Sequence, residues 1–220
     1  MYKVRLTFKK SGYAKYVSHL DLMRMFQRAF MRSELPISYS QGFNPHQKIS
    51  IAFPLPLGVT GEREYMDIEL DEQIEFSELI TRLNDALPPD IKVSYASYPN
   101  QKTSLLSRAV YTVEIDLKNN ISNLPEKIEN MLNQNEIVVE KKTKKGIFDT
   151  DIKPSIISFS TLDFCGKNLV LKLTLSCADG ASLKASVVVD ALKKYIPQFD
   201  VDFMKIHRDG LFLENMREIS

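Results

Sequence analysis

Hydrophobic and polar residues alternate in residues 2–9 and again in residues 64–70. The apolar positions of these two segments are Val4, Leu6, Phe8, Met66, Ile68 and Leu70. An alternation with a period of two is typical of a β-strand that buries one face. We therefore expect two half-buried strands here, and we expect further strands at 48–53 and 91–98.

Two other stretches of the first half repeat apolar residues every three to four positions, which is the spacing of a helix with one buried face. The first stretch follows Ser18, which with Asp21 forms a start that resembles a capping box. Its apolar positions are Leu22, Phe26, Ala29 and Phe30. The second stretch, at 76–87, is stopped by Pro88 and Pro89. The first half therefore reads strand, helix, strand, strand, helix, strand.

The second half repeats this order of elements. We expect strands and helices in the order strand 109–117, helix 121–131, strands 155–164 and 168–176, helix 182–195 and strand 203–213. An additional strand at 136–141 and a basic loop at 142–154 are inserted before the hairpin. The repeated order predicts an α+β fold of two tandem ferredoxin-like halves, 1–103 and 104–220. Each half would be βαββαβ, an antiparallel sheet with its helices on one face.

The polar sides of the first strands carry opposite charges. In the predicted arrangement the first and third strands are neighbours, so that Lys3, Arg5 and Lys9 lie beside Tyr65, Asp67 and Glu69. Each such cross-strand pair contributes about 0.2–1 kcal/mol and cancels basic potential. The open face of the sheet is therefore a poor platform for nucleic acid, and we expect it to pack on the other half or to stay solvated.

Composition narrows the class of protein. The chain has 220 residues and is 44% hydrophobic, which suits a globular fold with one large or two small domains. We find no signal peptide or membrane span, and we expect a cytoplasmic protein. Three scattered histidines and the distant Cys165 and Cys177 predict no metal site. Phosphate-loop and dinucleotide motifs are missing, so we expect no cofactor and no small-molecule ligand.

The charges are unevenly distributed along the chain. Residues 1–60 hold nine Lys and Arg against two Asp and Glu, a net charge of +7. Residues 61–90 hold two against ten, a net charge of −8. Such asymmetry indicates either a surface that faces a polyanion or two segments that face each other in the fold.

The most distinctive stretch of the sequence is 39–58, a polar turn followed by a short apolar run and two prolines. Polar loops between rigid segments often carry function, although this one could also be a simple connection. Its candidate binding residues are Gln41, Asn44, His46 and Lys48.

Two basic segments accompany this loop. The first helix carries Arg24, Arg28 and Arg32 on its polar side, where bidentate contacts to phosphate are possible. Lys144 and Lys145 form a second candidate contact for RNA or a partner. Each segment has a plainer interpretation as a solvated surface.

Four motifs resemble one bacterial family. They are Ser18-His19-Leu20-Asp21, Ser40-Gln41-Gly42-Phe43-Asn44-Pro45-His46, Leu55-Pro56-Leu57-Gly58 and Glu64-Tyr65-Met66-Asp67. The chain is similar over most of its length to the radical-SAM-linked (radical-SAM-associated) domain family of unknown function. The resemblance implies that the protein acts with a radical SAM protein, and it implies no catalytic residues. Two cysteines cannot hold the iron–sulfur cluster of a radical SAM enzyme, so the cluster would belong to the partner.

Three functions are compatible with these patterns. The first is a non-catalytic adaptor that presents an RNA or ribonucleoprotein substrate to a radical SAM protein. The second is a metal-independent ribonuclease, with His46 as general acid or base and Lys48 stabilising charge. The third is an adaptor that binds protein alone. The sequence favours a binding protein over an enzyme.

Overall fold

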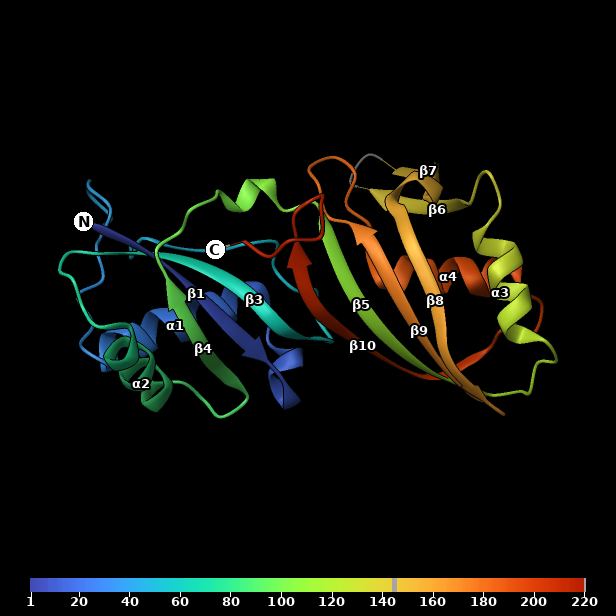
Figure 1. Ribbon diagram of the computed structural model, residues 1–220, viewed down its shortest axis with the longest axis horizontal. Helices are drawn as coiled ribbons and strands as arrows, with labels where there is room; N and C mark the ends of the chain where they lie inside the picture. Colours follow the sequence, from blue (N-terminus) through green and yellow to red (C-terminus); the bar gives the residue numbers. More distant parts are fainter. Residues whose placement is uncertain (144–145, 220) are drawn as a thin grey trace. The chain divides into compact units, whose positions relative to one another are not determined.

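The computed structural model describes residues 1–143 and 146–219 (Figure 1). The fold is mixed α/β, with mostly antiparallel strands and, in the part described, four α-helices. The chain forms two compact units. Unit 1 comprises Met1–Leu106 with Arg208–Ser220, and unit 2 comprises Ser107–His207.

Unit 1 contains the predicted order of strands and helices. Its elements are β1 (Tyr2–Lys10), α1 (His19–Arg32), β2 (Ile49–Ile51), β3 (Val59–Leu70), α2 (Phe76–Ala86) and β4 (Ile91–Ser97), with short 3-10 helices at Gly12–Tyr16 and Thr103–Leu105. β1 lies between β4 and β3, and β2 pairs with β3. β1 pairs antiparallel with β3 and with β4, and β2 pairs antiparallel with β3.

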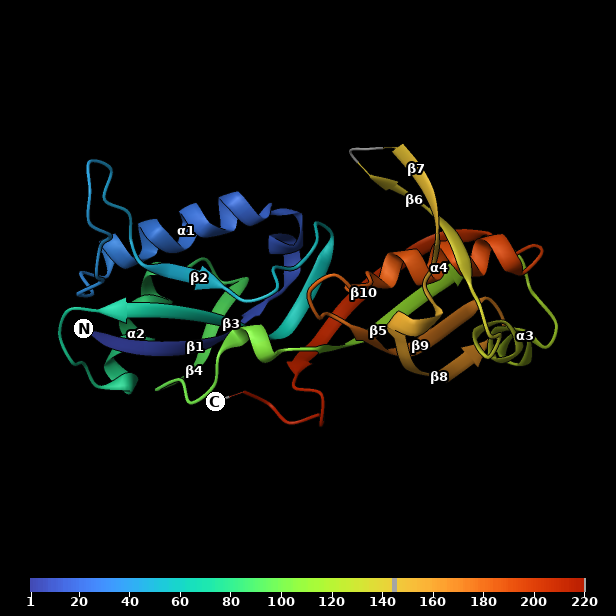
Figure 2. The ribbon, with the colours of Figure 1, turned by 90° about the horizontal axis from the view of Figure 1, so that it is seen from above.

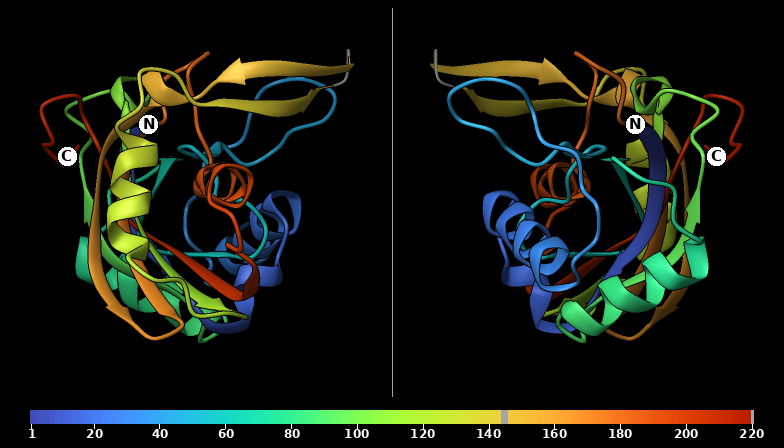
Figure 3. Two further views of the ribbon diagram at one scale, coloured as in Figure 1. Left: turned by 90° about the vertical axis from the view of Figure 1, so that its right-hand side faces the viewer. Right: turned by 90° about the vertical axis from the view of Figure 1, so that its left-hand side faces the viewer.

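The core of unit 1 lies between its sheet and two helices. The buried residues of both helices share this core with the inward-facing residues of the strands, and the right-hand view of Figure 3 shows unit 1 from its end. The buried residues of α1 are Leu22, Phe26, Ala29 and Phe30, as predicted. They pack with the apolar positions of β1, and the rings of Phe8 and Phe26 meet edge to face with their centroids 5.1 Å apart. Ser18 begins the helix by accepting a hydrogen bond from the backbone N–H of Asp21, which confirms the predicted cap.

The opposite face of the sheet has two of the predicted charge neighbours, whereas Lys9 pairs with Glu62 and not with Tyr65, Asp67 or Glu69. Lys3 lies opposite Glu69 and Arg5 lies opposite Asp67 in the β1–β3 register. Arg5 Nε donates to Asp67 Oδ1 at 2.7 Å, and Arg5 Nη2 donates to Gln101 O at 2.8 Å. Only 1% of Arg5 is exposed. The chain that leaves β4 therefore covers this charge, and the expectation of a solvated face is wrong at Arg5.

Unit 2 also repeats the strand and helix order, with one difference. Its elements are β5 (Arg108–Leu117), α3 (Leu124–Leu132), β6 (Val138–Thr143), β7 (Gly146–Asp151), β8 (Ile156–Cys165), β9 (Asn168–Ser176), α4 (Ala185–Tyr195) and β10 (Val201–Phe212). Within it the strand order is β10-β5-β9-β8. Segment 142–154, which we expected to be a loop, contains all of β7, which pairs antiparallel with β6, and the start of a 3-10 helix at Lys153–Ser155. The insertion is a hairpin because its two strands satisfy each other's backbone hydrogen bonds.

The last part of β10 returns to unit 1, where β10 lies beside β3. Its first residue there, Arg208, is fully buried and forms an ion pair with Glu64, which is 1% exposed. Arg208 Nε donates to Glu64 Oε1 at 2.9 Å, and Arg208 Nη2 donates to Phe53 O at 2.7 Å. Lys10 is buried near this pair and donates from Nζ to Val17 O at 3.1 Å. The three charges form a buried cluster with a net charge of +1.

Lys10 is expected to weaken the fold at neutral pH. Desolvation lowers the pKa of Lys10, and this outweighs the attraction of Glu64. The charged form is therefore disfavoured in the folded state, and stability rises as the pH climbs from the lowered pKa towards the ordinary value of 10.5. Lys10→Met should stabilise the protein by about 1 kcal/mol at pH 7, and the gain should shrink above that lowered pKa.

Urea unfolding at several pH values measures this effect. Lys9→Met is the matched control, because Lys9 is a half-exposed neighbour paired with Glu62 at 2.8 Å. We expect it to change the free energy of unfolding by no more than about 0.5 kcal/mol. A Lys10→Met protein that is less stable than wild type at pH 7 would contradict the assignment.

Candidate functional site

The predicted arginines of α1 line a groove in unit 1. We call it the arginine groove and define it by its lining residues: Asp21, Arg24, Met25, Arg28, Arg32, Ala86, Leu87 and Pro88. Its volume is about 600 Å³. One wall is α1 and the other is the turn that follows α2. Three guanidinium groups and one carboxylate give the groove a net charge of +2.

The three arginines are engaged to different degrees. Arg24 Nη1 donates to Asp21 Oδ1 at 3.1 Å in an exposed pair. A hydrogen bond from the Ser18 hydroxyl and then Arg24 lower the pKa of Asp21. Arg32 Nη2 donates to Ala86 O at 2.5 Å. Within residues 1–143 and 146–219, we find no hydrogen bond or ion pair of the Arg28 side chain, which leaves it available to a ligand.

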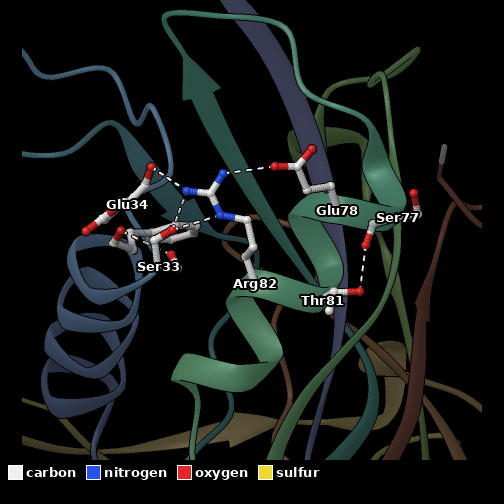
Figure 4. A network of polar contacts seen from close by, with 7 residues as sticks. Ser33, Glu34, Ser77, Glu78, Thr81 and Arg82 are labelled. Atoms are coloured by element: carbon white, nitrogen blue, oxygen red, sulfur yellow. Dashed lines mark hydrogen bonds and ion pairs between the residues drawn. The ribbon is translucent and has the colours of Figure 1, made fainter.

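Arg32 belongs to a reciprocal capping arrangement between the two helices. Arg82 of α2 donates to Ser33 O and Glu34 O, just after α1, at 2.6 to 3.0 Å (Figure 4). It also contacts Glu78 Oε1 at 3.0 Å. Each helix thus supplies a cation to the free carbonyl oxygens at the end of the other, which stabilises both ends. Arg32 therefore has a structural role beside its place in the groove, and sequence reasoning missed Arg82 because its partners lie far along the chain.

The candidate loop forms a narrow arm. We call residues 38–48 the hairpin arm, which extends from the end of α1 towards β2 (Figure 2). Tyr39 and Gln47 form a β-bridge, and Ser40 N donates to His46 O at 2.9 Å. Gln47 is buried and donates from Nε2 to Gln27 O of α1 and to Tyr39 OH, both at 3.2 Å. These bonds join the base of the arm to the helix.

The tip of the hairpin arm carries an aromatic side chain. Phe43 has a relative exposure of 110%, so no described residue covers it. Gly42 beside it has φ +118°, a conformation that favours glycine. The predicted binding residues Gln41 and Asn44 are exposed on either side. Sequence reasoning listed the polar residues of this turn and missed Phe43, although an aromatic residue within a polar turn was the available signal.

The other two predicted residues of the arm have partners. His46 Nδ1 lies 2.9 Å from Ser40 Oγ and 3.4 Å from Asn44 O. Lys48 Nζ donates to Glu69 Oε2 at 2.7 Å, and this bond lowers the pKa of Glu69. In the described residues no hydrogen bond or ion pair links Gln41, Asn44, His46 or Lys48 to the arginine groove, whose lining includes no residue of the arm. The structure therefore presents two separate candidate surfaces in unit 1.

Lys144 and Lys145, the remaining predicted residues, lie outside the described residues. Among the described residues, no helix combines the length and the apolar character needed to cross a bilayer.

Residues 3–185 match a family described as an uncharacterized protein conserved in bacteria, DUF2344. The chain belongs to DUF2344. The description of DUF2344 names no activity and no radical SAM partner, so the resemblance is confirmed only as membership of an uncharacterized bacterial family. The chain matches no curated protein.

This DUF2344 protein is similar to solved structures at low sequence identity. A chain of a Cbf5–Nop10–Gar1 complex aligns with a TM-score of 0.51 and 11% identity, covering 94% of this chain and 48% of that one. A chain of the archaeal box H/ACA sRNP Nop10–Cbf5 complex aligns with a TM-score of 0.49 and 10% identity, covering 94% and 47%. This protein spans about half the length of the solved chains that it matches. The similarity to the chain of the Cbf5–Nop10–Gar1 complex concerns the fold alone.

Proposed function

We propose that this DUF2344 protein is a non-catalytic binding protein that presents an RNA or a ribonucleoprotein to a radical SAM partner. The observation that carries the proposal is the arginine groove, which has a net charge of +2 and in which Arg28 is available. Arginine binds phosphate through paired N–H groups of fixed geometry. The groove is also open and has apolar walls, so a phosphate and part of a nucleoside could share it.

The radical SAM partner enters this proposal through the sequence motifs. The loop from Ser40 to His46, which is part of the resemblance, forms the exposed hairpin arm. A surface of this kind suits contact with another macromolecule better than catalysis, because its polar groups bond mainly to one another. We further propose that each unit is a ferredoxin-like domain, since both have a βαββαβ order and both place the first strand between the third and the fourth.

Binding of a fluorescent single-stranded RNA tests the groove. Arg28→Glu should weaken binding about tenfold and should reduce the dependence of affinity on salt, because fewer counterions are released. Fluorescence anisotropy across a series of salt concentrations measures both quantities. The control is Lys102→Glu, which makes the same change of charge at an exposed residue outside the groove. Equal losses in the two variants, or wild-type binding that does not depend on salt, would refute the phosphate contact.

The ribonuclease hypothesis receives less support from this geometry. Its charge stabiliser, Lys48, is held by Glu69 on β3, and the Nδ1 atom of His46 is engaged by Ser40. We expect His46→Ala to leave the rate of RNA cleavage by the purified protein at the background level of wild type. Cleavage by wild type that His46→Ala abolishes would reverse this conclusion.

A further inference from the structure

We infer that the hairpin arm is a docking probe that inserts Phe43 into an apolar pocket of a partner protein. The inference rests on the proposed function in one respect, namely that the chain works with another protein. It adds the residue that makes the contact and the chemistry of the surface that receives it.

The arm is rigid at its base before any partner arrives. A β-bridge joins its two sides at Tyr39 and Gln47, and the Ser40 hydroxyl accepts a hydrogen bond from His46 N at 3.1 Å. The Gln47 side chain, which is 6% exposed, ties the arm to the backbone of α1. Lys48 N donates to Ser38 O at 2.9 Å, and Ser38 N donates to Glu69 O at 2.8 Å, which links the arm to β3. A segment ordered in this way loses little conformational freedom on binding.

The tip then holds one large apolar group in water. Single exposed apolar residues are common on protein surfaces and have no meaning alone. Phe43 differs because it stands at the end of an arm held in place by hydrogen bonds, and it packs against none of residues 1–143 and 146–219. Burial of such a ring removes a large apolar area from water, and aromatic anchors in desolvated pockets dominate many interfaces.

The composition of the arm favours a protein pocket over nucleic acid. Residues 39–46 contain no Asp, Glu, Lys or Arg. Lys48, at the base of the arm, is paired with Glu69. Nucleic-acid surfaces combine stacking aromatics with cations that neutralise phosphates, and no such cation lies beside Phe43 in residues 39–46. A protein pocket with apolar walls and a polar rim suits it, because Gln41 and Asn44 place amides beside the ring.

Photo-crosslinking identifies what receives the ring. p-Benzoylphenylalanine is placed at Phe43 in the full-length chain, in cells of the source bacterium, and the matched control carries it at Leu57, an exposed apolar residue of another loop in unit 1 (65% exposed). The crosslinked polypeptide is then purified and titrated with wild type, Phe43→Ala and Leu57→Ala. We expect a crosslink at position 43 to one defined protein, a loss of affinity of about 30-fold for Phe43→Ala, and less than a threefold loss for Leu57→Ala.

The outcomes separate this inference from the proposed function. Phe43→Ala should leave the melting temperature and the RNA titration unchanged, whereas Arg28→Glu should leave the protein titration unchanged. If the protein does not bind RNA but Phe43→Ala still weakens binding to the partner protein, RNA binding by the arginine groove is refuted and the docking role of Phe43 stands. Crosslinks at position 43 to RNA alone, no crosslink at that position, or equal affinity of wild type and Phe43→Ala would each overturn the inference.

Discussion

Glu64→Gln should destabilise the protein by about 3–5 kcal/mol, because it leaves the fully buried guanidinium of Arg208 without its counter-charge. The intact pair adds little net stability, since both ions lose their hydration on folding. Removal of one partner leaves only the cost of that lost hydration. Lys10 lies near the same site, so that the substitution raises the net charge of the cluster from +1 to +2. Urea unfolding followed by circular dichroism measures the loss.

Two controls test the electrostatic origin of this effect. Glu62→Gln changes a half-exposed carboxylate on the same strand, and we expect a loss of at most about 0.5 kcal/mol. Lys10→Met combined with Glu64→Gln should restore part of the stability, because it removes the second unneutralised cation. The double-mutant cycle would then show a favourable coupling. Losses of the same size for Glu64→Gln and Glu62→Gln would show that the buried pair is no more important than a surface pair.

Phe26→Ala should lower the free energy of unfolding by about 3–5 kcal/mol, because it leaves a cavity in the core of unit 1. Phe26 is fully buried on α1, between Phe8 at 5.1 Å and Phe30 at 6.4 Å between ring centroids. The strands and both helices close around it, so the site cannot collapse easily. The midpoint of urea unfolding gives the change, and Phe26→Leu should lose less because it fills part of the space.

The matched control for this substitution is Phe43→Ala. It removes the same side chain from a position where none of the described residues covers the ring, so we expect no measurable change in stability. Comparable losses for Phe26→Ala and Phe43→Ala would mean that the arm packs against the protein in solution, contrary to the docking inference.

The spacing of apolar residues predicted the helices and strands, because the residues that an element buries must recur with the period of that element. The apolar stripe of α1 and the alternation of β1 can be recognised from residues that are close in the sequence, and both are confirmed. The predicted strand order placed β1 beside β3, and the Arg5–Asp67 pair confirms that these strands are neighbours. The strand expected at 136–141 corresponds to β6, whereas β7 was missed because charged residues obscured its pattern.

Long-range polar contacts were not predictable in the same way. Arg208 was not recognised as a core residue, because its partner Glu64 is 144 residues away and no local pattern joins them. The mutual capping by Arg32 and Arg82 depends likewise on how two helices end in space. The sequence identified the exposed turn at 39–46 correctly as a surface feature, but polar composition directed attention away from Phe43.

The place of Arg208 in unit 1 also has a consequence for biosynthesis. A ribosome produces residues 107–207 after the first 106 and before the segment that supplies this cation. Until that segment emerges, β3 lacks β10 beside it and the carboxylate of Glu64 lacks its guanidinium. Unit 1 is therefore translated first and completed last. While the middle of the chain is made, β3 is an open sheet edge that the nascent chain must keep from aggregating.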